Sequence, residues 1–136
     1  MQLVLDTNVV LDLLVFDDAG ARPLAEAVRA GTVRWLATAA MREELARVLA
    51  YPKLAQRVHF HRGGSAPVLE DFDRHVTLVP EAPKAPLTCG DADDQKFIDL
   101  AVAHQCPLLS KDWEVLRMTK RLAQLQVTAS DCWAGK

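Results

Sequence analysis

The sequence has no strong excess of charge of either sign. It contains 16 Lys and Arg residues against 18 Asp and Glu residues, which gives a formal net charge of −2 at pH 7. A protein held to nucleic acid by a general basic field would carry a clear positive excess. Any nucleic-acid binding must therefore depend on local basic patches.

Cysteine is scarce and irregularly spaced. Cys89, Cys106 and Cys132 are odd in number and lack C-x-x-C spacing, which is typical of reduced thiols rather than of a disulfide or zinc framework. His59 and His61 form a His-x-His pair, but no third ligand of matching spacing lies near them. We interpret both histidines as surface or loop residues.

Long hydrophobic runs are also missing. No window is long enough to span a bilayer, and the first apolar run has no basic segment before it and ends at Asp6. We therefore expect a cytoplasmic protein with no membrane association. The 136 residues, 50% of them hydrophobic, are enough for one domain with its own core, residues 1–136.

The most informative stretch is the amino terminus. Leu3 to Leu5 form an apolar run that predicts a strand buried on both faces of a parallel sheet, and the run ends abruptly in Asp6, Thr7 and Asn8. Ligands of open α/β sheets bind outside the carboxyl ends of the strands, so a carboxylate at that edge is placed to meet one. The alternative is that Asp6 or Asn8 only caps the next helix.

Strands and helices alternate along the rest of the chain. This alternation predicts an α/β fold, a three-layer sandwich with a central, mostly parallel sheet. An extended connection is expected at 80–90, which contains three prolines. Further strands are expected at 33–36, 76–79, 107–109 and 126–128, and helices at 9–15, 24–30, 39–49, 67–75, 91–104 and 113–125.

Three aspartates gather at the start of the helix at 91–104. Asp91 can cap this helix, and Asp94 lies three residues further on, in a carboxylate version of the capping box. With Asp93, the aspartates exceed what capping needs, although a helix amino terminus tolerates extra negative charge. Because 97–103 is almost entirely apolar, the helix should be buried against the sheet with its amino end at the edge where Asp6 lies.

Two further acidic positions are candidates for the same edge. Asp112 follows the strand at 107–109, which repeats the pattern of apolar strand, polar turn and aspartate seen around Asp6. Glu44 lies on the helix at 39–49 beside Glu43, and adjacent helical residues point about 100° apart, so only one of them can face the core edge. For a glutamate on such a helix, the alternative is a solvated face.

If the first and fourth strands are neighbours, Asp6, Asp94 and Asp112 converge at one sheet edge, and Glu44 can join them. Clustered carboxylates repel one another, so a cation or a proton must relieve the site. Oxygen ligands without organised His or Cys favour Mg²⁺ or Mn²⁺ over zinc. Such a site can deprotonate water and neutralise charge on a phosphodiester, which predicts metal-assisted in-line hydrolysis with one ion or two.

Four stretches of the sequence, in this order, form a recognisable set: LVLDTNVV at 3–10, ELARVL at 44–49 followed by Pro52 and Lys53, DADDQKF at 91–97, and LSKD at 109–112. In these stretches the chain resembles PIN domains, in particular the VapC-like toxin components of toxin–antitoxin systems. The resemblance keeps motif order and spacing over nearly the whole chain, and it implies a Mg²⁺- or Mn²⁺-dependent, single-strand-directed endoribonuclease.

The same resemblance implies roles for individual side chains. The acids that match the catalytic and metal-binding set are Asp6, Glu44, Asp94 and Asp112, with Asp91 or Asp93 as a supporting acid. The polar residues that match those orienting the carboxylates are Thr7, Asn8 and Ser110.

Two positions depart from the family pattern. Many members carry another Asp shortly after the last one, whereas Trp113 and Glu114 follow Asp112 here. The pair Glu43 and Glu44 leaves the helical acid ambiguous by one residue, and Glu44 is preferred because the following leucines and valine then fall in the family's register.

RNA is the expected substrate, and a small antitoxin protein is a candidate partner. A homodimer is expected because the helices at 9–15 and 24–30 are more apolar than the outer layer of a small monomer needs. The alternative is that the segment at 57–75 covers them. The basic candidates for steering the phosphate backbone are Arg42, Arg47, Lys53, Arg57 and Lys111, and further Arg117, Lys120 and Arg121.

Three other functions begin from similar residues. A haloacid-dehalogenase-type phosphatase, with Asp6 as nucleophile, needs a second Asp where this chain has Asn8. A receiver-like signalling module needs an acidic pair after the first strand, and only Asp6 is present, although Lys111 follows a late strand. A PIN fold retained as a non-catalytic binding or scaffold module is the third alternative, and the intact acidic set argues against it.

Overall fold

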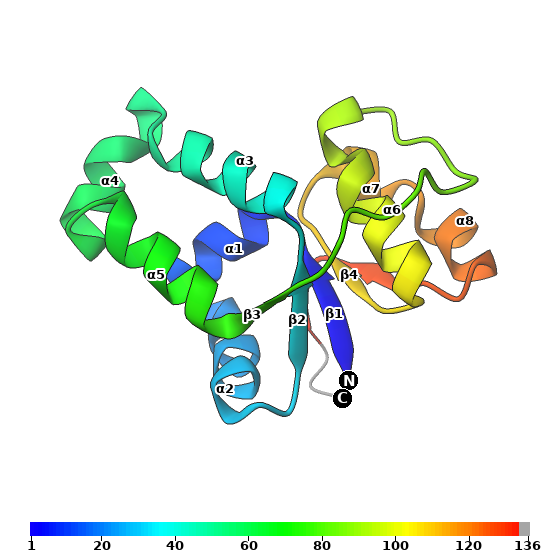
Figure 1. Cartoon of the computed structure of the whole chain (residues 1–136), viewed down its shortest axis with the longest axis horizontal. Coiled ribbons are helices and arrows are strands. Elements are labelled where there is room, and N and C mark those ends of the chain that lie inside the picture. Colours follow the sequence, from blue (N-terminus) through cyan, green and yellow to red (C-terminus); the bar gives the residue numbers. More distant parts are fainter. Residues whose placement is uncertain (134–136) are drawn as a thin grey trace.

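The apolar run at the amino terminus forms the central strand of the sheet. In the computed structural model, which describes residues 1–133, β1 (Gln2–Leu5) lies between layers of helices, with Leu3 to Leu5 buried (Figure 1). The strand order is β3-β2-β1-β4-β5 and every pairing is parallel, so the predicted α/β sandwich is confirmed. The other strands are β2 (Arg34–Ala37), β3 (Val76–Leu78), β4 (Leu108–Leu109) and β5 (Ala129–Ser130).

The helices divide between the two faces of the sheet (Figure 1). The chain steps from β1 to β2 to β3 in one direction and then returns past β1 to β4, and right-handed crossovers in opposite directions place their helices on opposite faces. One layer holds α1 (Thr7–Leu14), α2 (Arg22–Ala30), α3 (Ala39–Leu49), α4 (Pro52–Arg62) and α5 (Ser65–His75), with the turn η1 (Ala19–Ala21). The other holds the turn η2 (Ala92–Asp94) with α6 (Gln95–His104), α7 (Trp113–Leu116) and α8 (Thr119–Gln124).

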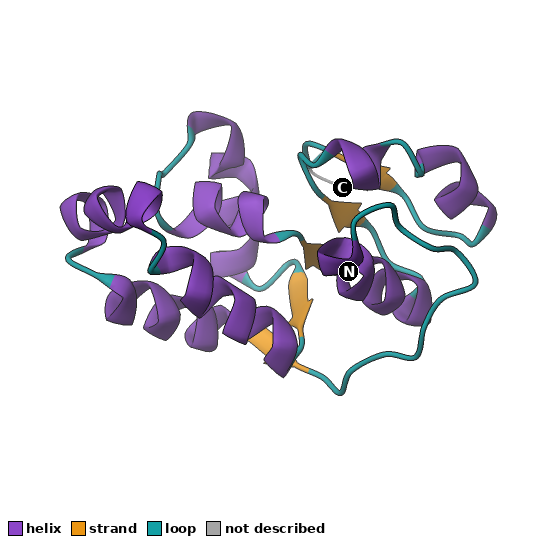
Figure 2. Ribbon diagram, turned by 90° about the horizontal axis from the view of Figure 1, so that it is seen from above, coloured by secondary structure: helices purple, strands orange, loops and turns teal. Residues whose placement is uncertain are grey.

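Several element boundaries follow from the capping residues. Thr38 accepts a hydrogen bond from the Met41 N–H at 3.4 Å and caps the amino end of α3, which spans the predicted range 39–49. Gly31 ends α2 with φ of 76°, a left-handed conformation that glycine adopts without steric cost. The expected extended connection at 80–90 is also found, as part of a long loop that carries the chain from β3 to the opposite helix layer (Figure 2).

Two predicted elements at the carboxyl end were wrong. The predicted helix at 113–125 is broken into α7 and α8, at the point where the Thr119 hydroxyl donates to the Leu116 carbonyl oxygen at 2.6 Å and competes with the backbone hydrogen bonds of a continuous helix. The last strand is Ala129–Ser130 and not 126–128, because Gln126 takes a left-handed conformation with φ of 67° that ends α8 in a turn.

Two surface features bear on the sequence-based expectations. His59 and His61 are exposed on α4, so their interpretation as surface residues holds. The apolar residues of α1 and α2 are largely buried within the chain, where α5 packs against α1 and α1 packs against α2. For α1, the alternative that the segment at 57–75 covers the helix therefore holds. The apolar character of these helices therefore gives no support to a homodimer, which stays a prediction.

None of the helices in residues 1–133 is long and apolar enough to cross a membrane.

Candidate functional site

The pairing of β1 with β4 brings the residues that follow both strands together. Leu5 lies opposite Leu109, and the Asp6 N–H donates to the Leu109 carbonyl oxygen at 2.9 Å. The next residue, Ser110, is fully buried, and its Oγ donates to Asp6 Oδ2 at 2.6 Å. The first and fourth strands are thus neighbours, which is the condition on which the expected convergence of the acids depended, and their pairing accounts for this contact between distant parts of the sequence.

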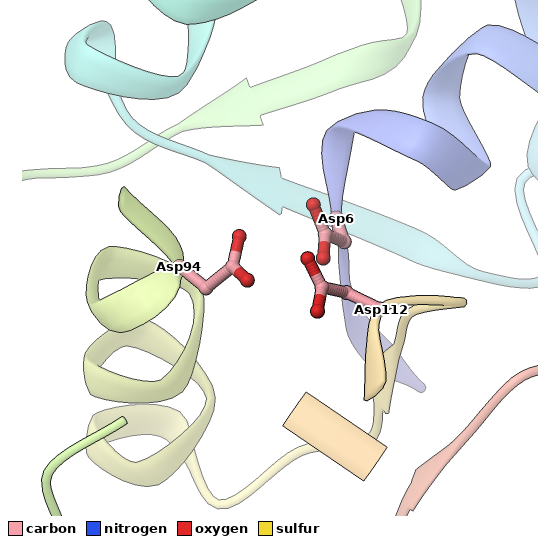
Figure 3. Close-up of side chains that lie close together, drawn as sticks. All are labelled: Asp6, Asp94 and Asp112. Carbon is pink, nitrogen blue, oxygen red and sulfur yellow. The ribbon is translucent and has the colours of Figure 1, made fainter. Parts of the chain in front are cut away.

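Asp112 and Asp94 reach the same edge from two other elements. Asp112 begins α7, where its Oδ1 accepts a hydrogen bond from the Glu114 N–H at 2.8 Å. Asp94 lies at the amino end of α6, a helix that packs against β1 and β4. One oxygen from each of Asp6, Asp94 and Asp112 lies within 4.8 Å of the others, and Figure 3 shows the three carboxylates pointing toward one another.

Two of the three aspartates are buried, the third is half-buried, and the cluster is electrostatically strained. Asp6 is 3% exposed and Asp94 is 7% exposed. Burial, together with the neighbouring Asp6 and Asp112 carboxyl groups, raises the pKa of Asp94 to about 8. Burial also raises the pKa of Asp6, although the hydrogen bond from Ser110 acts in the opposite direction.

One oxygen of the cluster has no partner. Asp94 Oδ2 is buried and makes no hydrogen bond within the described part of the chain. A buried carboxylate oxygen without a donor is costly, and a cation or a proton bound between the aspartates would remove that cost. The donor set consists of oxygens alone, which suits Mg²⁺ or Mn²⁺.

Glu44 lies beside this cluster but is not one of the three converging acids. Its Oε2 accepts a hydrogen bond from the Thr7 hydroxyl, and its Oε1 pairs with the Lys96 ammonium group. Glu44 still contributes to the raised pKa of Asp6 by charge repulsion. Glu43 is exposed, so the structure places Glu44 and not Glu43 next to the site.

Lys96 is a site residue that sequence reasoning missed. Besides its ion pair with Glu44, its ammonium group donates to the Asp93 carbonyl oxygen and lies 4.9 Å from the centre of the Phe97 ring. The signal in the sequence was its position two residues after Asp94, inside the acidic motif. No role was predicted for Lys96, because nothing in the sequence indicates which helix faces it.

The remaining predicted residues have structural contacts around the edge. Asn8 Oδ1 accepts from the Lys111 N–H at 3.2 Å, which ties the two strand ends together. Asp91 Oδ1 accepts from the Asp93 N–H at 2.9 Å, so Asp91 caps the η2 turn. Asp91 is not among the three acids whose oxygens converge, and Asp93 is exposed.

Two of the basic candidates, Arg42 and Arg57, already contact other side chains of the protein. Arg42 makes two hydrogen bonds with the Asp73 carboxylate, at 2.7 and 2.9 Å. The Arg57 guanidinium carbon lies 4.1 Å from the centre of the Phe16 ring. These groups are only partly available to a phosphate.

The other basic candidates differ in whether they already form an ion pair. Lys111 forms an ion pair with Asp12, which lies on α1. Arg47 and Lys53 are exposed and form no ion pair with any residue in 1–133. The further candidates Arg117, Lys120 and Arg121 are exposed on the α7–α8 side.

Comparison with known proteins identifies the fold. The family model described as "PIN domain" matches residues 2–111. A solved structure described as VapBC2 from Rickettsia felis, bound to a DNA fragment from their promoter, matches with a TM-score of 0.64 and 15% sequence identity, over 95% of this chain and 98% of that chain. At this identity the match shows a shared fold. No curated protein matches the sequence.

Proposed function

The chain belongs to the PIN domain family, and on that premise we propose that it is a divalent-metal-dependent endoribonuclease and the toxin of a toxin–antitoxin pair. The observation that carries the proposal is the cluster of Asp6, Asp94 and Asp112, whose oxygens lie within 4.8 Å of one another, together with the partnerless Asp94 Oδ2. Such a buried set of carboxylates is unfavourable in an empty site and favourable around a hard cation.

The three aspartates would hold the metal. When bound, Mg²⁺ or Mn²⁺ lowers the pKa of a coordinated water and neutralises charge that develops on a phosphodiester. The protein's part is to fix the ligands. Ser110 holds one oxygen of Asp6, and the Glu114 N–H holds Oδ1 of Asp112, so each carboxylate presents its other oxygen in a set direction.

Ser110 stabilises this arrangement through a second hydrogen bond. The Ser110 hydroxyl also accepts the Asp112 N–H at 3.0 Å, so a single side chain joins two of the three acids. Since Ser110 is fully buried, water does not compete for these hydrogen bonds. We infer that these hydrogen bonds fix the positions of the acids before substrate binds.

An exposed aromatic residue supports a single-stranded substrate. Trp113 directly follows Asp112 and is 68% exposed, which is unusual for a tryptophan. Bases of single-stranded nucleic acid stack on such side chains, and each stacked base contributes about 1–3 kcal/mol. A base paired in a duplex has both faces covered, so a stacking residue beside the acids favours an unpaired strand.

The partner part of the proposal rests on the sequence motifs and on the fold match. VapBC2 of Rickettsia felis was solved with DNA from its promoter, and its chain shares this fold over nearly its whole length. We propose that this chain also pairs with a small antitoxin protein. A gene for a small DNA-binding protein beside the gene for this chain would support that part, as would rescue of growth when the two are expressed together.

The alternative in which the fold is a non-catalytic binding module predicts a different result in one assay. The purified chain should be incubated with single-stranded RNA, double-stranded RNA and single-stranded DNA of one sequence, with Mg²⁺ or Mn²⁺ and with EDTA. The proposal predicts cleavage of single-stranded RNA that requires the metal. Binding of RNA without metal-dependent cleavage would favour the non-catalytic module, and release of phosphate from a phosphomonoester would favour a phosphatase.

A further inference from the structure

We propose that Lys96 holds Glu44 out of the metal-binding set and takes the place of a second divalent cation, so that the site binds one ion per chain. This inference rests on the proposed function in one respect, namely that the three aspartates bind a divalent cation. It concerns the side of the site formed by α1, α3 and α6, where Glu44 and Lys96 lie next to the three aspartates.

The contacts of Glu44 show why it is withdrawn from the cluster. Both of its carboxylate oxygens already have partners, Oε2 in the Thr7 hydroxyl and Oε1 in the Lys96 ammonium group. The side chains of Glu44 and Lys96 are only 14% and 22% exposed, so this ion pair is shielded from solvent far more than an ordinary surface pair. To bind a metal, Glu44 would have to give up at least one of these contacts.

Lys96 is held in place from three directions. Its ammonium group contacts the Glu44 carboxylate, the Asp93 carbonyl oxygen and the face of the buried Phe97 ring. A lysine usually has a flexible stem, and these contacts remove that freedom. The positive charge is therefore fixed at the side of the site where Glu44 approaches Asp6.

The charge of the site leads to the stoichiometry. With Lys96 paired to Glu44, the carboxylates that remain are the three aspartates, and one divalent ion neutralises most of their charge. Without the ammonium group, Glu44 becomes a free carboxylate next to Asp6. Four free carboxylates match the charge of two divalent ions, so the loss of Lys96 should open a second metal position.

The test counts bound Mn²⁺ ions per chain, by isothermal titration calorimetry and by the electron paramagnetic resonance signal of free Mn²⁺. The variants are Lys96→Met and the double variant Lys96→Met with Glu44→Gln. Lys120→Met is the matched control, because Lys120 is exposed on α8 and forms no ion pair with any residue in 1–133.

We expect one ion in the parent chain and in Lys120→Met, two ions in Lys96→Met, and one ion again in the double variant. Two ions in the parent chain, or a single ion of unchanged affinity in Lys96→Met, would overturn the role of Lys96 and leave the proposed nuclease in place. If no form of the chain binds Mn²⁺, both the inference and the metal part of the proposed function are wrong.

The unpaired Glu44 of Lys96→Met is a folding risk that the double variant avoids, because Glu44→Gln removes the partner charge. If Lys96→Met does not fold, the parent chain and the double variant still decide. Two ions in either of them contradict the inference, and one ion in both supports it.

Discussion

Ser110 Oγ donates a hydrogen bond of 2.6 Å to Asp6 Oδ2, although 104 positions separate the two residues in the sequence. The parallel pairing of β1 with β4 produces this contact, because it aligns Leu5 with Leu109 and so places the residues that follow them side by side. The bond fixes the orientation of the most buried aspartate of the cluster. Ser110 therefore links the topology of the sheet to the geometry of the candidate metal site.

The first prediction tests that link. Ser110→Ala should lower the rate of RNA cleavage by roughly 10- to 150-fold, because a hydrogen bond to a charged group is typically worth about 1.5–3 kcal/mol. Ser130→Ala is the matched control, since the one hydrogen bond of its hydroxyl within residues 1–133 goes to the Cys132 carbonyl oxygen. Single-turnover cleavage rates compare the two variants. Equal rates for both would show that Ser110 does not orient Asp6.

The second prediction concerns pH and the metal-free chain. The pKa of Asp94 is about 8 in the folded chain, against an ordinary value of 3.8, so the folded state binds a proton that the unfolded state has released. The free energy of unfolding should therefore fall as the pH rises from about 4 to about 8. Asp94→Asn should flatten this dependence, because its side chain does not titrate.

Urea unfolding in EDTA at several pH values measures this slope. Asp131→Asn is the control, since Asp131 is an exposed carboxylate. The parent's free energy of unfolding should fall more steeply with pH than that of Asp94→Asn. If the two slopes are equal, Asp94 is not the group whose pKa is raised in the folded chain. Added Mn²⁺ should stabilise the parent more at high pH, because the metal competes with the proton.

The third prediction concerns base stacking on Trp113. Trp113→Ala should weaken binding of a single-stranded RNA by about 5- to 150-fold, the equivalent of about 1–3 kcal/mol, and Trp113→Phe should retain much of the affinity. Binding is best measured with metal absent, so that cleavage does not interfere. If Trp113→Ala and the parent bind single-stranded RNA equally well, the exposed ring has another role.

The fourth prediction separates free basic residues from paired ones. Arg47→Ala with Lys53→Ala should weaken RNA binding and reduce its salt dependence, because both side chains are exposed and form no ion pair in residues 1–133. Arg42→Ala should change the salt slope less, since Arg42 already pairs with Asp73. A larger effect from Arg42 than from the free pair would place the RNA path elsewhere. Fluorescence anisotropy over a salt series provides the slopes.

The sequence predicted the sheet edge well because local patterns determine it. Short apolar runs followed directly by Asp6 and by Ser110 to Asp112 mark strands that end in polar residues, and a parallel sheet gathers such ends at one edge. The same reasoning placed Asp94 at the amino end of a buried helix. These inferences need only the order of the elements.

The contacts of Glu44 could not be predicted from the sequence, because they depend on how the helices face one another. Whether Glu44 joins the aspartates or pairs with Lys96 depends on the distance between α3 and α6, and no periodicity in either helix encodes it. The break between α7 and α8 was also missed. It lies where the Thr119 hydroxyl donates to the Leu116 carbonyl oxygen, and no proline or glycine marks that position in the sequence.

The most direct test of the account is Asp6→Asn, followed by RNA cleavage and by the shift in melting temperature on adding Mn²⁺. Asn preserves the shape of the side chain but removes one charge and one hard ligand from the cluster. We predict a folded chain that has lost cleavage, shows a smaller Mn²⁺-induced shift, and is at least as stable as the parent without metal. Asn and Asp are near equals as helix caps, so a variant that cleaves RNA at the parental rate with an unchanged metal shift would show that Asp6 is only a cap.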